Sequence, residues 1–113
     1  SNTTLQRPPQ LTSENQEESG GLSGQALFRI STNTLRMFAA ALKGRLPLIG
    51  AGGVDSGSAA LIKIKAGASA VQLYSALVYE GPGLVARILN ELDGLLAADG
   101  FDTVAQAVGV DLA

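Results

Sequence analysis

The sequence predicts an α/β protein with parallel strands, because two apolar segments each lead through a short turn into a helical pattern. Residues 46–49 are followed by a glycine-rich turn at residues 50–53, and residues 70–73 are followed by Tyr74 and Ser75. Strands that alternate with helices are typical of a parallel sheet covered by helices. In a (β/α)8 barrel, two consecutive turns of this kind after the last two strands form a phosphate site. The predicted fold is therefore the C-terminal portion of such a barrel: its last two strands with their helices, preceded by a long loop.

Length and composition set limits on this prediction. The chain has 113 residues, of which 46% are hydrophobic, and a mean hydropathy of +0.24, which is typical of one small globular domain. A complete barrel needs about 250 residues, so we expect the chain to hold less than half of one. The net charge of −2 and the absence of a basic cluster argue against nucleic acid as a partner.

The absence of some residue types removes several kinds of chemistry. The sequence contains no cysteine, which excludes disulfides and thiolate nucleophiles, and no histidine, the commonest general base and metal ligand. We therefore expect no metal site. No apolar run reaches the roughly 18–20 residues that a membrane-spanning helix needs, so we expect this segment itself to be soluble.

Helical periodicity predicts the elements around the strands. A first helix begins near Ser31 or Thr32, either of which can cap it, and ends before Gly44. Its apolar stripe is Leu35, Phe38, Ala39 and Leu42. Because residues 46–49 are apolar throughout, we expect this strand to be buried on both faces.

Two further helices follow the strands. Asp55 or Ser56 can cap the first, which ends at Gly67, and the second starts at Pro82, in a position that favours proline. The apolar residues of the first are Ala60, Leu61 and Ile64, and those of the second are Val85, Ile88, Leu89, Leu92 and Leu96. The solvated face of the second is interpreted as Arg87, Glu91 and Asp93. A short last helix is predicted at about residues 103–108.

The glycine-rich turn is the strongest candidate for a binding site. Residues 50–57 do not fit a dinucleotide-binding fingerprint, which needs glycine where Asp55 stands. A Walker A loop needs a lysine in the turn, whereas Lys63 and Lys65 lie inside the next helix. What remains is a tight turn whose glycines let backbone N–H groups approach an anion, beside the positive end of the following helix. A monophosphate fits such a turn, and a merely tight strand–helix connection stays open as the alternative.

Other polar and glycine-rich segments each allow more than one interpretation. Ser75 offers a hydroxyl and an N–H to a phosphate oxygen, and Tyr74 either joins it or packs at a barrel rim. The glycine cluster at residues 20–24 either lies against a planar ligand or forms a flexible turn. Residues 2–4 either hydrogen-bond a small polar substrate or form a frayed terminus. Residues 5–23 are polar and irregular, which is typical of a lid, a binding loop or a solvated linker.

Taken in order, these motifs closely resemble the C-terminal third of dihydroorotate dehydrogenase, with spacings that need no insertion. The matching motifs are Ser-Asn-Thr-Thr at residues 1–4, Gly-Gly-Leu-Ser-Gly at residues 20–24, Leu-Pro-Leu-Ile-Gly-Ala-Gly-Gly-Val at residues 46–54, and the segment from Lys-Ala-Gly to Glu-Gly-Pro at residues 65–82. Within the last motif, residues 72–82 resemble the quinone-dependent class 2 branch.

The resemblance implies a (β/α)8 barrel that holds FMN and oxidises dihydroorotate to orotate in pyrimidine biosynthesis, with a quinone as electron acceptor. It makes residues 5–23 an active-site loop, residues 46–75 the phosphate-binding unit and residues 82–113 the C-terminal helices. The residues that it implies bind FMN are Ser1, Gly24, Gly52, Gly53, Tyr74 and Ser75. Those that it implies bind the substrate are Asn2 and Thr3.

The resemblance also implies that much of the enzyme lies outside this chain. The family's catalytic base, a serine in class 2, and its flavin-contacting lysine are expected upstream, so we expect no catalytic residue here and no turnover by this chain alone. The rest of the barrel, as an upstream segment or a second chain, is then a required partner. The complete enzyme is expected to be a peripheral protein at the cytoplasmic face of the inner membrane.

Two other functions stay open at the level of sequence. One is another phosphate-binding barrel enzyme, such as a different FMN oxidoreductase or a sugar-phosphate isomerase, since Gly-Gly turns serve all of them. The other is a catalytically inert fragment that associates with itself through open strand edges. Bound FMN distinguishes the flavin enzymes from both the isomerase and the inert fragment.

Overall fold

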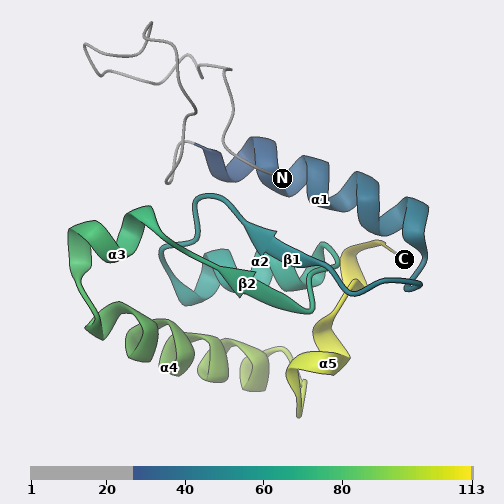
Figure 1. Ribbon diagram of the computed structural model, residues 1–113. Coiled ribbons are helices and arrows are strands. Elements are labelled where there is room, and N and C mark those ends of the chain that lie inside the picture. The colour runs from purple at the N-terminus through teal and green to yellow at the C-terminus, as the bar shows by residue number, and fades with distance from the viewer. Residues whose placement is uncertain (1–26, 113) are drawn as a thin grey trace, which may run out of the picture.

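The computed structural model describes residues 27–112. Along the chain the elements are α1 (Phe28–Leu42), β1 (Ile49–Ala51), α2 (Gly57–Lys65), β2 (Ala70–Gln72), α3 (Ser75–Glu80), α4 (Gly83–Ala98), α5 (Val104–Ala107) and a short 3-10 helix, η2 (Val110–Leu112) (Figure 1). Outside the described residues lie Ser1, Asn2, Thr3, Gly24 and the expected loop at residues 5–23. The sequence predicts the order of the strands and the larger helices, and it misses α3.

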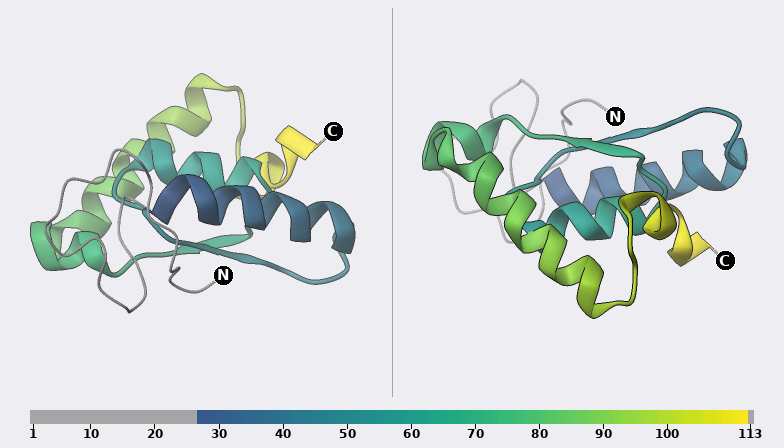
Figure 2. Two further views of the ribbon diagram at one scale, coloured as in Figure 1. Left: turned by 90° about the horizontal axis from the view of Figure 1, so that it is seen from above. Right: turned by 90° about the horizontal axis from the view of Figure 1, so that it is seen from below.

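The strands β1 and β2 form a two-stranded parallel sheet, as the sequence predicts. Ile49 pairs with Ala70 and Ala51 pairs with Gln72, with α2 as the connection between the strands. The helices α1, α2 and α4 lie on the same side of the strand pair in both views of Figure 2. The described chain is therefore a strand–helix–strand unit with helices on one face of its sheet.

The expectation that the first strand is buried on both faces is wrong for the described chain. Leu46 and Ile49 are each 60% exposed, and within β1 only Gly50 is buried. The reason is the arrangement in Figure 2, where helices cover one face of the strands and leave the other open among residues 27–112. The strand also begins at Ile49 rather than near residue 46, because Pro47 has no N–H to donate to a sheet.

Helix α1 begins earlier than the sequence predicts and buries a different stripe. Ser31 and Thr32 do not cap it but lie inside it, buried. The Phe28 carbonyl accepts a hydrogen bond from the Thr32 hydroxyl at 2.7 Å and lies 3.1 Å from the Ser31 hydroxyl. The predicted core residue Phe38 is 57% exposed, because the stripe that faces α2 is set by the buried positions Ser31, Thr32, Leu35 and Ala39. The predicted stop is confirmed, since Gly44 follows the left-handed cap residue Lys43 with φ +79°.

The main hydrophobic core lies between α2 and α4. Ser56 caps α2 by accepting a hydrogen bond from the Ala59 N–H at 3.1 Å, and Gly57 admits α4, since a Cβ there would lie 2.7 Å from the Leu92 nitrogen. The buried residues are Val54, Ala60, Leu61, Ile64, Leu84, Ile88, Leu92, Leu96 and Ala107. The predicted core residues Val85 and Leu89 are 45% and 60% exposed, because the core-facing stripe of α4 starts one residue earlier, at Leu84.

Candidate functional site

The carboxyl ends of the two strands bring four of the predicted site residues to one edge of the sheet. Because β1 and β2 are parallel and Ala51 pairs with Gln72, the chain leaves both strands on the same side. Gly52 and Gly53 follow β1, while Tyr74 and Ser75 follow β2 and lead into α3 (Figure 1). This is the edge at which ligands bind in parallel α/β folds.

The Gly52–Gly53 turn is closely packed against the start of α1. Both glycines have left-handed φ values, +99° and +77°, which other residues rarely adopt. A Cβ on Gly52 would lie 2.6 Å from the Ser31 hydroxyl oxygen, and a Cβ on Gly53 would overlap the backbone and Cβ of Phe28. Both glycines are therefore required by the conformation and packing of the chain itself, and not only by the approach of a ligand.

Within the described residues, the carbonyl of the Gly52–Gly53 peptide is hydrogen-bonded and its N–H is not. The Gly52 carbonyl accepts a hydrogen bond from the Ser31 hydroxyl at 3.1 Å. Within residues 27–112, the Gly53 N–H donates no hydrogen bond to another residue. The turn thus holds its carbonyl against α1 and leaves a backbone donor for another group.

The turn after β2 is more open. Tyr74 is 78% exposed, and Ser75, the first residue of α3, is half-buried. No residue of α3 is buried, and Val78 and Tyr79 are 70% and 87% exposed. Tyr74 thus packs little against residues 27–112, and its packing at a barrel rim stays a prediction, since these residues hold only two strands.

A buried lysine lies behind the Gly52–Gly53 turn. Lys63 of α2 is 0% exposed, and its Nζ lies 2.5 Å from the Ser31 hydroxyl oxygen and 3.5 Å from the Phe28 carbonyl oxygen. The ammonium also lies 4.8 Å from the centre of the Phe28 ring, within cation–π range. Burial lowers the pKa of Lys63 to about 8.

The sequence motif gives Lys63 no role, because a Walker A lysine lies in the turn and Lys63 lies inside the next helix. The signal that points to it is its position four residues after Ala59 and one before Ile64, both buried, which places it on the inner face of α2. A lysine on the buried face of a helix is uncommon and indicates a specific partner.

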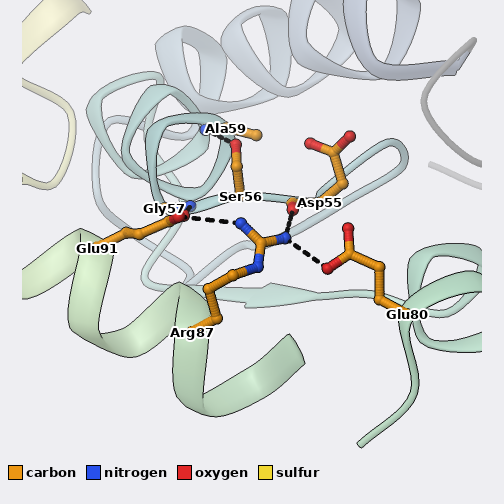
Figure 3. Close-up of polar contacts among 7 residues, drawn as sticks. All are labelled: Asp55, Ser56, Gly57, Ala59, Glu80, Arg87 and Glu91. Carbon is orange, nitrogen blue, oxygen red and sulfur yellow. Dashed lines mark hydrogen bonds and ion pairs between the residues drawn. The ribbon is translucent and has the colours of Figure 1, made fainter. Parts of the chain in front are cut away.

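A second polar cluster, shown in Figure 3, joins α4 to the start of α2. The Arg87 guanidinium donates to the Asp55 carbonyl at 2.7 Å, to the Glu80 carboxylate at 2.8 Å and to the Glu91 carboxylate at 2.9 Å. The other oxygen of Glu91 accepts a hydrogen bond from the Gly57 N–H at 2.8 Å. Arg87 and Glu91 lie on the solvated face of α4 as predicted, with side chains 40% exposed, and they also connect α4 to the start of α2.

This cluster places a negative charge of the protein at the start of α2. The hydrogen bond from the Gly57 N–H, and then the Arg87 guanidinium, lower the pKa of Glu91 below its ordinary value. The first N–H of α2 is therefore engaged by a carboxylate, and Ser56 engages the N–H of Ala59. Two N–H groups at the positive end of α2, which the sequence suggests as an anion site, thus have acceptors within the chain.

Two features that some functions require are absent from the described part of the chain. Residues 27–112 contain no group of three or more acidic, histidine or cysteine residues arranged to hold a metal ion. Over the same residues, no helix has the length and apolar character needed to cross a membrane.

The fold and this edge define a class of protein: a parallel α/β chain with a glycine turn at the carboxyl end of one strand and a polar turn at the end of its neighbour. A family comparison is more specific, since the sequence model of dihydroorotate dehydrogenase matches residues 1–96. The chain belongs to the dihydroorotate dehydrogenase family.

Individual relatives support this assignment. The chain is 55% identical over 111 residues to the dihydroorotate dehydrogenase (quinone) of Azorhizobium caulinodans, covering 98% of this chain and 31% of that protein. It is 53% identical over 110 residues to the mitochondrial dihydroorotate dehydrogenase (quinone) of Mus musculus, covering 97% of this chain and 28% of that one. The chain thus spans about a third of the length of the curated relatives it matches.

A solved structure agrees with the fold. The crystal structure of the ligand-free dihydroorotate dehydrogenase of Eimeria tenella superposes with a TM-score of 0.93 at 40% sequence identity, covering 97% of this chain and 30% of the other. The described arrangement of two parallel strands and their helices therefore matches part of that enzyme.

Proposed function

We propose that this chain is the C-terminal part of a quinone-dependent dihydroorotate dehydrogenase and supplies the site for the FMN phosphate. The observation that carries the proposal is the meeting of the Gly52–Gly53 turn and the Tyr74–Ser75 turn at one edge of a parallel sheet. The relatives named dihydroorotate dehydrogenase (quinone) share more than half of their matching residues with this chain.

The residues of the turn fit a phosphate group. Gly53 offers a backbone N–H with no acceptor among residues 27–112, and the ammonium of Lys63 lies behind it without a carboxylate partner in that range. Neutral donors and a nearby positive charge are the features that bind phosphate dianions. When bound, FMN supplies the hydride acceptor for oxidation of dihydroorotate to orotate, and a quinone then takes the electrons.

The roles of the remaining predicted residues belong to the same proposal. Ser1 and Gly24 contact the flavin, Asn2 and Thr3 bind the dihydroorotate ring, and Tyr74 with Ser75 completes the phosphate site. The catalytic base comes from the rest of the barrel. The complete enzyme acts at the cytoplasmic face of the inner membrane.

The open face of the strand pair supports a barrel that this chain only partly forms. Ile49, the first residue of β1, is 60% exposed, and the helices α1, α2 and α4 lie on one side of the strand pair (Figure 2). Burial of such a side chain stabilises a protein by about 1.5–3 kcal/mol. We propose that the remaining strands of the barrel, from an upstream segment or a second chain, cover this face.

The test is a chimera in which residues 1–113 replace the matching segment of the Azorhizobium caulinodans enzyme. We expect a yellow protein with one FMN per barrel that reduces a quinone when given dihydroorotate. Residues 1–113 alone, prepared in parallel, are expected to show no reduction of flavin by dihydroorotate. A folded chimera that binds no FMN, or turnover by residues 1–113 alone, contradicts the proposal.

A further inference from the structure

We propose that Ser31 and Lys63 act together as positioning residues that orient the Gly52–Gly53 peptide, turning the Gly53 N–H away from α1 and toward the bound anion. The inference rests on the proposed function of this turn as a phosphate site. It adds the residues that fix the direction of the donor, neither of which touches the phosphate in this scheme.

The hydrogen bonds of the Ser31 hydroxyl have a definite direction. An ammonium has only donors, so at 2.5 Å the Ser31 oxygen accepts from Lys63 and has its own proton left to donate. That proton has two acceptors at 3.1 Å, the carbonyls of Phe28 and Gly52. The Phe28 carbonyl already accepts from the Thr32 hydroxyl at 2.7 Å. The Ser31 hydroxyl therefore donates its hydrogen bond to the Gly52 carbonyl.

The peptide group that joins Gly52 and Gly53 links the direction of its carbonyl to that of its N–H. The Gly52 carbonyl and the Gly53 N–H belong to the same peptide group, which is trans like every peptide bond described here. In a trans peptide these two groups point in opposite directions. Holding the carbonyl toward Ser31 therefore points the N–H away from α1, where no residue of 27–112 accepts its hydrogen bond.

The positive charge of Lys63 has no carboxylate partner among residues 27–112. Within the described residues, the Lys63 ammonium contacts only neutral groups: the Ser31 hydroxyl and the carbonyl and ring of Phe28, all on α1. With a pKa of about 8 it is mostly protonated at pH 7. A buried charge with no counterion is costly, and its field extends further in the interior than in water. A phosphate on the far side of the turn provides the missing negative charge.

The experiment compares FMN with riboflavin, which lacks the phosphate, in the chimera described above. Four forms are stripped of flavin and titrated with each ligand: unsubstituted, Ser31→Ala, Lys63→Met and Lys65→Met. Lys65→Met is the matched control, because it removes the same charge from the same helix at a surface site, where Lys65 pairs with Asp99 at 2.6 Å. Circular dichroism and thermal unfolding establish that each form is folded.

The quantity measured is the ratio of the two dissociation constants, which reports the phosphate alone. We expect the unsubstituted and Lys65→Met forms to prefer FMN over riboflavin by the same factor. Ser31→Ala and Lys63→Met should reduce that preference about tenfold, the usual effect of losing a hydrogen bond to a charged group. If Lys63→Met does not fold, Ser31→Ala, which removes one oxygen, decides the result.

Two outcomes overturn the inference, and they are distinct from a failure of the proposed function. The inference is wrong if the folded variants keep the ratio of the control, or if they weaken FMN and riboflavin equally, as a purely structural role predicts. The proposed function itself fails if the unsubstituted chimera binds FMN no more tightly than riboflavin.

Discussion

The two turns at the carboxyl edge of the sheet are built in opposite ways. The turn after β1 is closed by the start of α1, with two glycines at positive φ, a buried serine and a buried lysine behind it. The turn after β2 leads into α3, which buries no residue, and its Tyr74 is 78% exposed. The first turn is thus enclosed by α1, whereas the Tyr74 side chain of the second turn is mostly exposed.

This difference separates two ways of building a binding site. At the first turn, structure and proposed function use the same atoms, since the conformation that packs against Phe28 and Ser31 also presents the Gly53 N–H. At the second turn, the exposed Tyr74 side chain contributes little to the packing described here. Substitution of Tyr74 should therefore have little effect on stability, whereas substitutions at the first turn should lower it.

The largest expected effect is that of Gly53→Ala. The new Cβ would overlap the backbone and Cβ of Phe28, and the backbone would be held at φ +77°. Left-handed strain alone costs about 1–2 kcal/mol for an alanine, and the overlap with backbone adds to it. We expect the free energy of unfolding of the chimera to fall by about 3 kcal/mol or more in chemical denaturation.

The control for this variant is Gly100→Ala. Gly100, which follows the end of α4, has a similar φ, +84°, but a Cβ there would meet no atom within 4 Å. It should cost only the left-handed strain, about 1–2 kcal/mol. Equal losses for the two variants would show that α1 does not close on the turn as described.

The sequence allows much of this edge to be predicted, for reasons that are local. The two strands, the cap at Ser56 and the core residues Ala60, Leu61 and Ile64 are confirmed because short-range patterns determine them. The meeting of the two turns follows from the parallel pairing of β1 and β2.

The sequence does not predict which side chains of distant helices form hydrogen bonds with one another. Lys63 has its partners on α1, 32 and 35 residues away, and Glu91 caps a helix that begins 34 residues before it. Periodicity also leaves the centre of a helix face uncertain by about one position. For this reason Val85, which periodicity predicts for the core, is exposed, and Leu84 is buried in its place. The exposure of Phe38, another predicted core residue, has the same cause.

The next effect in size concerns Glu91, which accepts a hydrogen bond from the Gly57 N–H at the start of α2. Its pKa is lowered in the folded chain, so the unfolded chain binds protons more readily. Its contribution to stability is therefore complete above its ordinary pKa of 4.5 and is lost as the pH falls through the lower folded value. We expect Glu91→Gln to lower the melting temperature at pH 7, and this difference from the unsubstituted chimera to shrink as the pH falls below about 4.

Asp93→Asn is the matched control, since Asp93 lies on the same helix, is exposed and forms none of the ion pairs found among residues 27–112. It should leave the melting temperature nearly unchanged at both pH values. A Glu91→Gln effect no larger than that of Asp93→Asn would show that the Gly57 N–H does not depend on this carboxylate.

The smallest expected effect on stability is that of Tyr74→Phe at the second turn. With Tyr74 78% exposed, loss of its hydroxyl should change the free energy of unfolding by less than about 0.5 kcal/mol. If the backbone at this position holds the phosphate, FMN affinity should change by less than about threefold. Ser75→Ala, which removes a hydroxyl proposed to bind the phosphate, should weaken FMN about tenfold. Denaturation and flavin titration of the chimera measure both quantities, and a marked loss of stability in Tyr74→Phe would mean that the second turn is as firmly packed as the first.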